Sequence, residues 1–199
     1  MYGGLPFTPL EDLINKQFLL TTIAMSGFSR EKAYENMLES GWFWYSQKNY
    51  KVAMKRFNQA WLINPKDPRV LNAYGAVTDE LGRKQEAIKW YRQGAEKGDA
   101  KAQYNLAEEY FRGKTLKRNY LEAAKWYRKA ADQNLNWALN MIGVCYEYGL
   151  GVPRSIDESR KWYKKADEKG GIEPKRLEFR GQTQIDEFEI PPEGQMITE

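Results

Sequence analysis

The chain has 199 residues, of which 42% are hydrophobic and 29% are charged, as in a globular protein. It contains one cysteine and no histidine, which excludes an intrachain disulfide, histidine-dependent catalytic triads and most zinc sites. The net charge is +4, and the mixing of basic and acidic residues favours a solvated helical surface over a nucleic-acid binder.

Two features bear on where the protein resides. No apolar run approaches the roughly 18 residues needed to cross a bilayer, so we expect no transmembrane segment. The first ten residues lack the basic and apolar regions of a signal peptide. The sequence therefore predicts a cytoplasmic protein if Met1 is native, and a periplasmic or envelope protein if the chain is a trimmed mature form.

The first predicted element is a helix over residues 9–25. Thr8 suits the N-cap position, Pro9 the first helical position, and Glu11 follows two residues later, as at the start of many helices. Because an open array of hairpins needs its first hairpin covered, we predict that residues 1–29 form an N-terminal capping helix.

The chain then repeats itself. Three segments begin with Lys-Trp-Tyr, and their tryptophans are spaced by 36 residues: Trp90, Trp126 and Trp162. Columns upstream follow the same period, as in Gly113 and Gly149. A period of 34–36 residues is typical of stacked helical hairpins, because one hairpin cannot bury its apolar face alone.

Two kinds of hairpin are distinguished by the interval between small residues on their two helices. The interval is 12 residues in the first two hairpins, for Gly41–Ala53 and Gly75–Ala87. It is 16 residues in the next two, for Ala107–Ala123 and Gly143–Ser159. We therefore predict two short-loop hairpins over residues 30–98 and two long-loop hairpins over residues 99–170.

The short-loop units resemble tetratricopeptide repeats, and the long-loop units resemble the Sel1-like repeat of bacterial proteins. Residues 146–170 match the Sel1-like pattern closely, whereas residues 110–134 carry Thr115 and Leu116 in its Gly-Val positions. The resemblance covers about residues 31–170. It implies an all-α fold, a right-handed α-α superhelical solenoid of about four hairpins, with an N-terminal capping helix and an irregular C-terminal tail.

In this repeat class the first helix of each hairpin lines a concave face. In the aromatic run of residues 42–45, Trp44 is assigned to the core and Phe43 to a position under the N-terminal helix. Trp42 and Tyr45 are assigned to the concave face, where aromatic and asparagine side chains are suited to binding another chain. The predicted partner-binding groove contains Trp42, Tyr45, Arg69, Asn72, Lys101, Tyr104, Asn105, Phe111, Trp137 and Asn140.

The last segment, residues 171–199, has lost the repeat and holds seven acidic against three basic residues, a net charge of −4. Two interpretations stay open. The segment is disordered, or it is an extended segment that docks on the basic surface of the chain's own body. In the second case the apolar anchors are Phe179, Phe188 and Ile190.

These features favour a non-enzymatic protein without catalytic residues, cofactor or metal. Adjacent carboxylates such as Glu108 and Glu109 diverge by about 100° on a helix and do not converge on one substrate atom. Cys145, flanked by Val144 and Tyr146, is expected to be buried. The resemblance implies an adaptor that binds a protein or peptide, or alternatively an immunity protein that neutralises a secreted bacterial effector enzyme.

Overall fold

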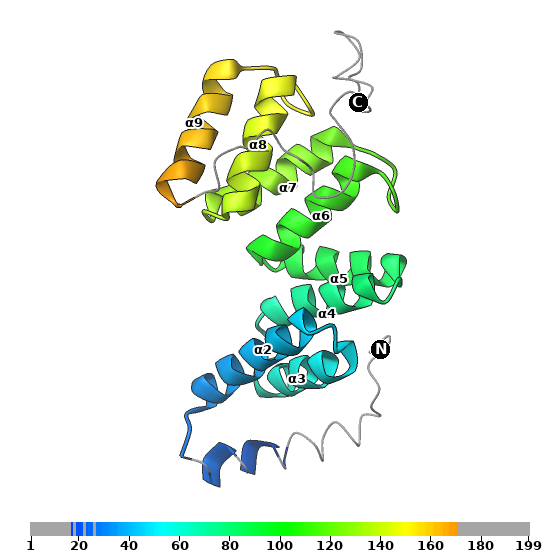
Figure 1. The fold of residues 1–199 in the computed structure, drawn as a ribbon, viewed down its shortest axis with the longest axis vertical. Coiled ribbons are helices and arrows are strands. Elements are labelled where there is room, and N and C mark those ends of the chain that lie inside the picture. Colours follow the sequence, from blue (N-terminus) through cyan, green and yellow to red (C-terminus); the bar gives the residue numbers. More distant parts are fainter. Residues whose placement is uncertain (1–16, 18, 22, 26, 171–199) are drawn as a thin grey trace. The chain divides into compact units, whose positions relative to one another are not determined.

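The computed structural model describes residues 17, 19–21, 23–25 and 27–170. Every regular element in these ranges is an α-helix (Figure 1). Successive helices from α2 onward form four hairpins, which confirms the all-α helical repeat fold predicted from the sequence. The helices are α2 (Arg30–Ser46), α3 (Tyr50–Ile63), α4 (Arg69–Glu80), α5 (Lys84–Glu96), α6 (Ala100–Arg112), α7 (Tyr120–Asp132), α8 (Asn136–Tyr148) and α9 (Ile156–Glu168).

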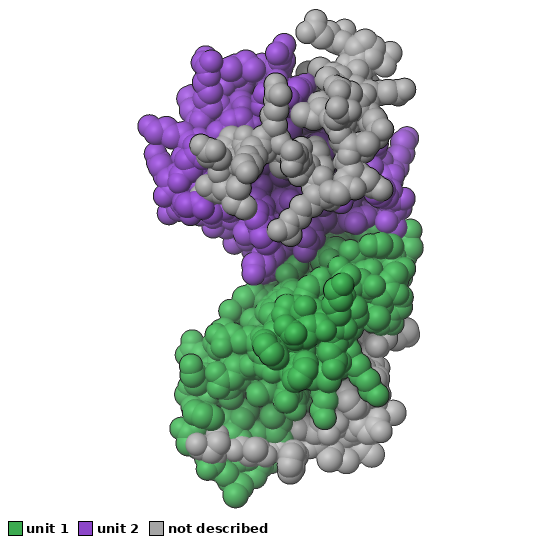
Figure 2. All heavy atoms as spheres, in the orientation of Figure 1, with its two compact units in different colours: residues 1–94 green, residues 95–199 purple. Residues whose placement is uncertain are grey.

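The chain divides into two compact units, residues 1–94 and residues 95–199 (Figure 2). In unit 1 the helices of each hairpin cross at a glycine. A methyl group added at Gly41 would collide with the ring of Phe57, and one added at Gly75 would collide with the ring of Tyr91. Glycine is therefore required at both crossings, because the aromatic ring of the second helix occupies the space of a side chain.

Helical residues also precede α2. Residues 17, 19–21 and 23–25 are helical, and Leu19 and Ile23 pack against the core of unit 1. This agrees with the predicted N-terminal helix, although the start of that helix and its capping residues lie outside the described residues. The prediction for Phe43 is wrong, because its ring is 57% exposed. Leu19 and Ile23 pack against the core of the unit, whereas Phe43 is not among the described residues that do so and contacts Trp44 edge-on at 5.4 Å between ring centroids.

Unit 2 contains the hairpins α6–α7 and α8–α9, whose long loops close in the same way. The first helix of each ends at a glycine in the left-handed conformation, Gly113 with φ 66° and Gly149 with φ 70°. A backbone bond then closes the loop, from Asn119 N to Tyr110 O at 2.9 Å and from Ser155 N to Tyr146 O at 2.8 Å. Because these pairs are 36 residues apart, much of the sequence repeat reflects loop closure.

The crossing residue in unit 2 again faces an aromatic ring. Gly143 lies against Tyr163, and Ala107 belongs to the same buried cluster as Tyr127. Cys145 is fully buried in this cluster, as predicted, and burial raises the pKa of its thiol to about 12. The predicted tail, residues 171–199, lies outside the described residues.

Candidate functional site

One candidate site lies within unit 2, on the first helices α6 and α8. Trp137, at the start of α8, is 57% exposed. Its ring centroid lies 5.9 Å from that of the half-buried Tyr104 on α6. The two residues are 33 positions apart in the sequence, yet the packing of consecutive hairpins brings their rings into contact. We call this region, with Lys101, Asn105 and Asn140, the α6–α8 surface.

The aromatic pair is supported from the core side. Tyr104 contacts the buried ring of Tyr127 at 5.7 Å, and the Tyr127 hydroxyl donates to Glu108 Oε1 at 2.5 Å. Glu108 also pairs with Arg112 at 2.6 Å. Burial, with the nearby Glu108 carboxylate, raises the pKa of Tyr104 well above its usual value. Tyr104 is therefore neutral at ordinary pH and is fixed by its contact with Tyr127, while Trp137 is largely exposed.

Polar side chains accompany the aromatic pair. Lys101 is exposed, and Asn105 and Asn140 are half-buried. Asn140 Nδ2 donates to Asn136 O at 3.2 Å, and Asn136 Nδ2 donates to Lys169 O at 3.1 Å. Among the described residues, neither Asn136 Oδ1 nor Asn140 Oδ1 receives a hydrogen bond. Both oxygens are enclosed within the chain.

Two residues assigned to the groove are not available at a surface. Phe111 is 2% exposed because it lies beside the turn to α7, where its ring meets Tyr120 at 5.4 Å and Tyr127 at 6.1 Å. Asn72 is 3% exposed because α4 is buried continuously from Val70 to Thr78. Both assignments to an open groove are corrected by this burial.

The remaining groove residues of unit 1 do not gather at one place. Trp42 is half-buried and contacts Phe57 at 5.2 Å and Tyr45 at 5.4 Å. The Tyr45 hydroxyl donates to Glu80 Oε1 at 3.5 Å, at the far end of α4 from Arg69. Burial, followed by the Glu80 carboxylate, raises the pKa of Tyr45 to about 12. Trp42 and Tyr45 thus serve mainly to pack α2 on its neighbours.

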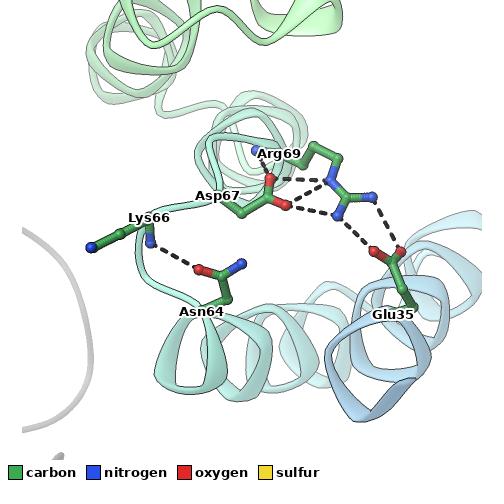
Figure 3. Close-up of polar contacts among 5 residues, drawn as sticks. All are labelled: Glu35, Asn64, Lys66, Asp67 and Arg69. Carbon is green, nitrogen blue, oxygen red and sulfur yellow. Dashed lines mark hydrogen bonds and ion pairs between the residues drawn. The ribbon is translucent and has the colours of Figure 1, made fainter. Parts of the chain in front are cut away.

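Arg69 lies instead in a cleft of about 650 Å³ at the N-terminal ends of α2 and α4. Figure 3 shows its guanidinium between two carboxylates. It bonds Glu35 in bidentate fashion at 2.7 and 3.1 Å, and it bonds Asp67 at 2.7 to 3.1 Å. The guanidinium also lies 5.1 Å from the centre of the Tyr34 ring.

The electrostatics of this cleft favour a structural role. Burial acts to raise the pKa of Asp67, but the hydrogen bonds from Arg69 outweigh it and lower that pKa. The hydrogen bonds that Arg69 donates to Asp67 and to Glu35 raise the pKa of Arg69 in turn. Nearby, Arg30 donates two hydrogen bonds to Ile63 O. The polar groups are thus largely satisfied by one another, and they join α2 to α4.

The sequence held a signal for this contact that the groove prediction missed. Glu35 and Arg69 each stand six residues before a crossing glycine, Gly41 and Gly75. Equivalent positions on neighbouring first helices lie side by side in stacked hairpins. Opposite charges at such positions predict an ion pair between hairpins rather than a free arginine.

In the described part of the chain, no three or more Cys, Asp or Glu residues gather closely enough to hold a metal ion. None of the helices described has the length and apolar composition that crossing a membrane requires.

Part of the chain matches a known repeat family. Residues 79–99, 100–135 and 138–170 match the sequence model of the Sel1 repeat. A crystal structure of a Sel1 repeat protein from Oxalobacter formigenes is 34% identical, with a TM-score of 0.58, over 66% of this chain and 53% of that protein. The protective antigen c5321, present in uropathogenic Escherichia coli strains and displaying an SLR fold, is 28% identical, with a TM-score of 0.60.

The lengths differ between these proteins. The similarity to c5321 covers 78% of this chain but 33% of that protein, so this chain spans about a third to a half of these two proteins. No curated protein sequence matches it. Sel1 repeats generally mediate protein–protein interactions and typically form non-catalytic scaffolds.

Proposed function

This chain is a Sel1 repeat protein, with repeats at residues 79–99, 100–135 and 138–170, and we propose that it is a non-enzymatic module that binds a protein partner through the α6–α8 surface. Lys101, Tyr104, Asn105 and Asn140 lie within these repeats, and Trp137 lies between the last two of them. The predicted continuation of the groove onto unit 1 is not needed for this proposal, because Trp42, Tyr45 and Arg69 contact Phe57, Glu80 and Glu35 within that unit.

The observation that carries the proposal is the exposed Trp137 ring in contact with Tyr104. A tryptophan that is 57% exposed on a folded helix offers large apolar area at little conformational cost, since its neighbours already hold it. Tryptophan and tyrosine are enriched among the residues that dominate binding energy at interfaces. The pair therefore has the properties of an interface anchor rather than of a core residue.

Polar side chains of the surface add a reason for a peptide-like partner. Lys101 is exposed, and Asn105 and Asn140 are half-buried. Lysine and asparagine side chains can form hydrogen bonds with the backbone of a bound segment, so the surface combines an aromatic anchor with polar groups suited to a peptide.

The test compares two single variants of the full-length chain as bait. Trp137→Ala removes the anchor, and Phe43→Ala removes an aromatic ring of the same 57% exposure in unit 1. We expect a partner retained by the wild type and by Phe43→Ala to be lost with Trp137→Ala. The affinity for that partner should fall about 30-fold or more, since anchor truncations exceed about 2 kcal/mol.

Thermal unfolding supplies the control for this experiment. Because Trp137 is largely exposed, its variant should melt within a few degrees of the wild type. A partner that binds the folded Trp137→Ala variant with unchanged affinity would overturn the proposal. If the captured partner is a secreted enzyme whose activity falls on adding the chain, but not on adding Trp137→Ala, the function is that of an immunity protein.

A further inference from the structure

The strongest feature outside the α6–α8 surface is the end of unit 2 where its two long loops meet. Gly151 in the α8–α9 loop has φ 71° and lies against the backbone of Tyr120 and Leu121, at the start of α7. A side chain at residue 151 would collide with that backbone. We call residues 112–121 and 149–156 together the loop edge.

The loop edge is strongly basic. All five of its basic side chains are exposed, and neither segment contains an acidic residue: Arg112, Lys114, Lys117, Arg118 and Arg154. One of these cations is already paired, because Glu108 bonds Arg112 at 2.6 Å. Three other carboxylates at the margins contact groups outside the loop edge: Glu122 pairs with Lys125 at 3.1 Å, Asp157 pairs with Arg160 at 3.7 Å, and Glu147 accepts the Tyr163 hydroxyl at 2.7 Å.

The loop edge is apolar as well as basic. Leu121, in the first turn of α7, is 64% exposed, and Ile156, the first residue of α9, is 41% exposed. Isolated exposed apolar residues need no explanation. Two of them beside five cations, on loops that contact each other, form a surface suited to a segment that is both acidic and apolar.

The chain carries a segment of that composition. Residues 181–199 hold five carboxylates and no lysine or arginine. Within them, residues 185–190 read Ile-Asp-Glu-Phe-Glu-Ile, so that apolar and acidic side chains are interspersed. We propose that this acidic segment docks on the loop edge of its own chain, with its carboxylates on the cations and its apolar side chains on Leu121 and Ile156.

The connection is long enough for this contact. The loop edge lies at the start of α9, and the described chain ends just after that helix, at Gly170. A 13-residue helix is about 20 Å long. The 14 residues 171–184 can span up to about 46 Å when extended. The acidic segment can therefore return along α9 to its start, and the contact does not involve the α6–α8 surface.

Zero-length carbodiimide cross-linking of the full-length chain tests the proposal. The reagent joins a lysine amine to a carboxylate only where the two are in contact. We expect Asp186, Glu187 and Glu189 to link to Lys114 and Lys117 within one molecule, and these links to fall at least fivefold in 0.5 M NaCl, where surface charges are screened. Lys97 and Lys164, exposed lysines of the same unit, are the comparison amines.

A variant of the acidic segment completes the test. In the triple variant Asp186→Asn, Glu187→Gln and Glu189→Gln, acetylation of Lys114 and Lys117 should accelerate about threefold or more, while that of Lys97 and Lys164 stays constant. Links spread evenly over all four lysines, or acetylation rates that do not change, would overturn the proposal. Links found only between isotopically distinct copies would also overturn it, because they would show association between chains.

Discussion

The two units use the same helical positions for different purposes. Six residues before the crossing residue, unit 1 carries Glu35 and Arg69, which bond each other at 2.7 Å and join two first helices. The corresponding position on α8 in unit 2 carries Trp137, which remains 57% exposed. The difference teaches that one repeat position either joins neighbouring hairpins or presents a side chain to a partner, depending on whether its neighbour offers a complementary group.

A second difference concerns the ring that covers each crossing residue. In the first hairpin of unit 1 the ring of Phe57 has no hydroxyl, whereas the second hairpin uses Tyr91. In unit 2, Tyr127 donates to Glu108 at 2.5 Å and Tyr163 donates to Glu147 at 2.7 Å. Each carboxylate belongs to the first helix of the same hairpin. Both hairpins of unit 2 therefore add a charge-assisted hydrogen bond to the apolar contact, which the Phe57 hairpin cannot do.

The largest effect on stability is expected from removing the Tyr127 side chain, and with it both the buried ring and the hydrogen bond to Glu108. Tyr127→Ala should destabilise unit 2 by about 3–5 kcal/mol, because it removes a fully buried aromatic side chain. Tyr127→Phe should cost about 1.5–3 kcal/mol, the usual value of a hydrogen bond to a charged group. If both variants lose the same stability, the hydroxyl and not the ring carries the contact.

The thiol of Cys145 gives a measurement confined to unit 2. It is fully buried, and burial raises its pKa to about 12, so a thiol reagent should modify it only when unit 2 opens. In urea titrations monitored by Cys145 labelling, both Tyr127 variants should show a lower midpoint than the wild type. The matched Phe57→Ala variant of unit 1 should leave the labelling midpoint of Cys145 nearly unchanged.

The sequence predicted the fold well because the repeated residues have repeated structural tasks. Gly113 and Gly149 end helices in the left-handed conformation, and Gly143 makes room for Tyr163. Such requirements act within a single hairpin and can be read from spacing. The pattern also located the core role of Cys145, which depends only on the apolar face of α8.

The candidate site was predicted less well, because exposure depends on what covers a position. Tyr104 and Trp137 do meet, and both are residues of the predicted groove. Phe111 is buried by Tyr120 and Tyr127, because it lies beside the hairpin turn. Arg69 is not free to line a groove, because Glu35, at the equivalent position of the preceding hairpin, carries the opposite charge and pairs with it.

Alkaline pH should weaken the contacts of Tyr45 in unit 1. Burial and Glu80 raise its pKa to about 12, whereas an unfolded tyrosine ionises near pH 10. Its contribution is complete below pH 10 and is lost as the pH rises from about 10 to 12, because only the unfolded state releases the proton. Tyr45→Phe should therefore reduce the fall in urea midpoint between pH 9 and 11. An identical fall in variant and wild type would contradict this assignment.

The smallest effect is expected at the ion pair that joins α2 to α4. Glu35→Gln should cost about 0.2–1 kcal/mol at neutral pH, since both side chains are partly exposed, at 38% and 43%. The matched variant Glu39→Gln changes an exposed carboxylate on the same helix. Urea titration at low salt should show a larger loss for Glu35→Gln than for Glu39→Gln, and the difference should shrink in 0.5 M NaCl.

Acid titration sharpens the same comparison through Asp67. Burial opposes ionisation of this carboxyl, but the hydrogen bonds from Arg69 lower its pKa below the usual value. A lowered pKa contributes stability above the unfolded value of about 3.9 and loses it as the pH falls through the folded value. Asp67→Asn should therefore flatten the acid limb of the unit 1 stability profile. Because Trp137 occupies the equivalent position of α8 without an acidic partner, the Cys145 labelling midpoint in unit 2 should follow the same acid dependence in Asp67→Asn and wild type.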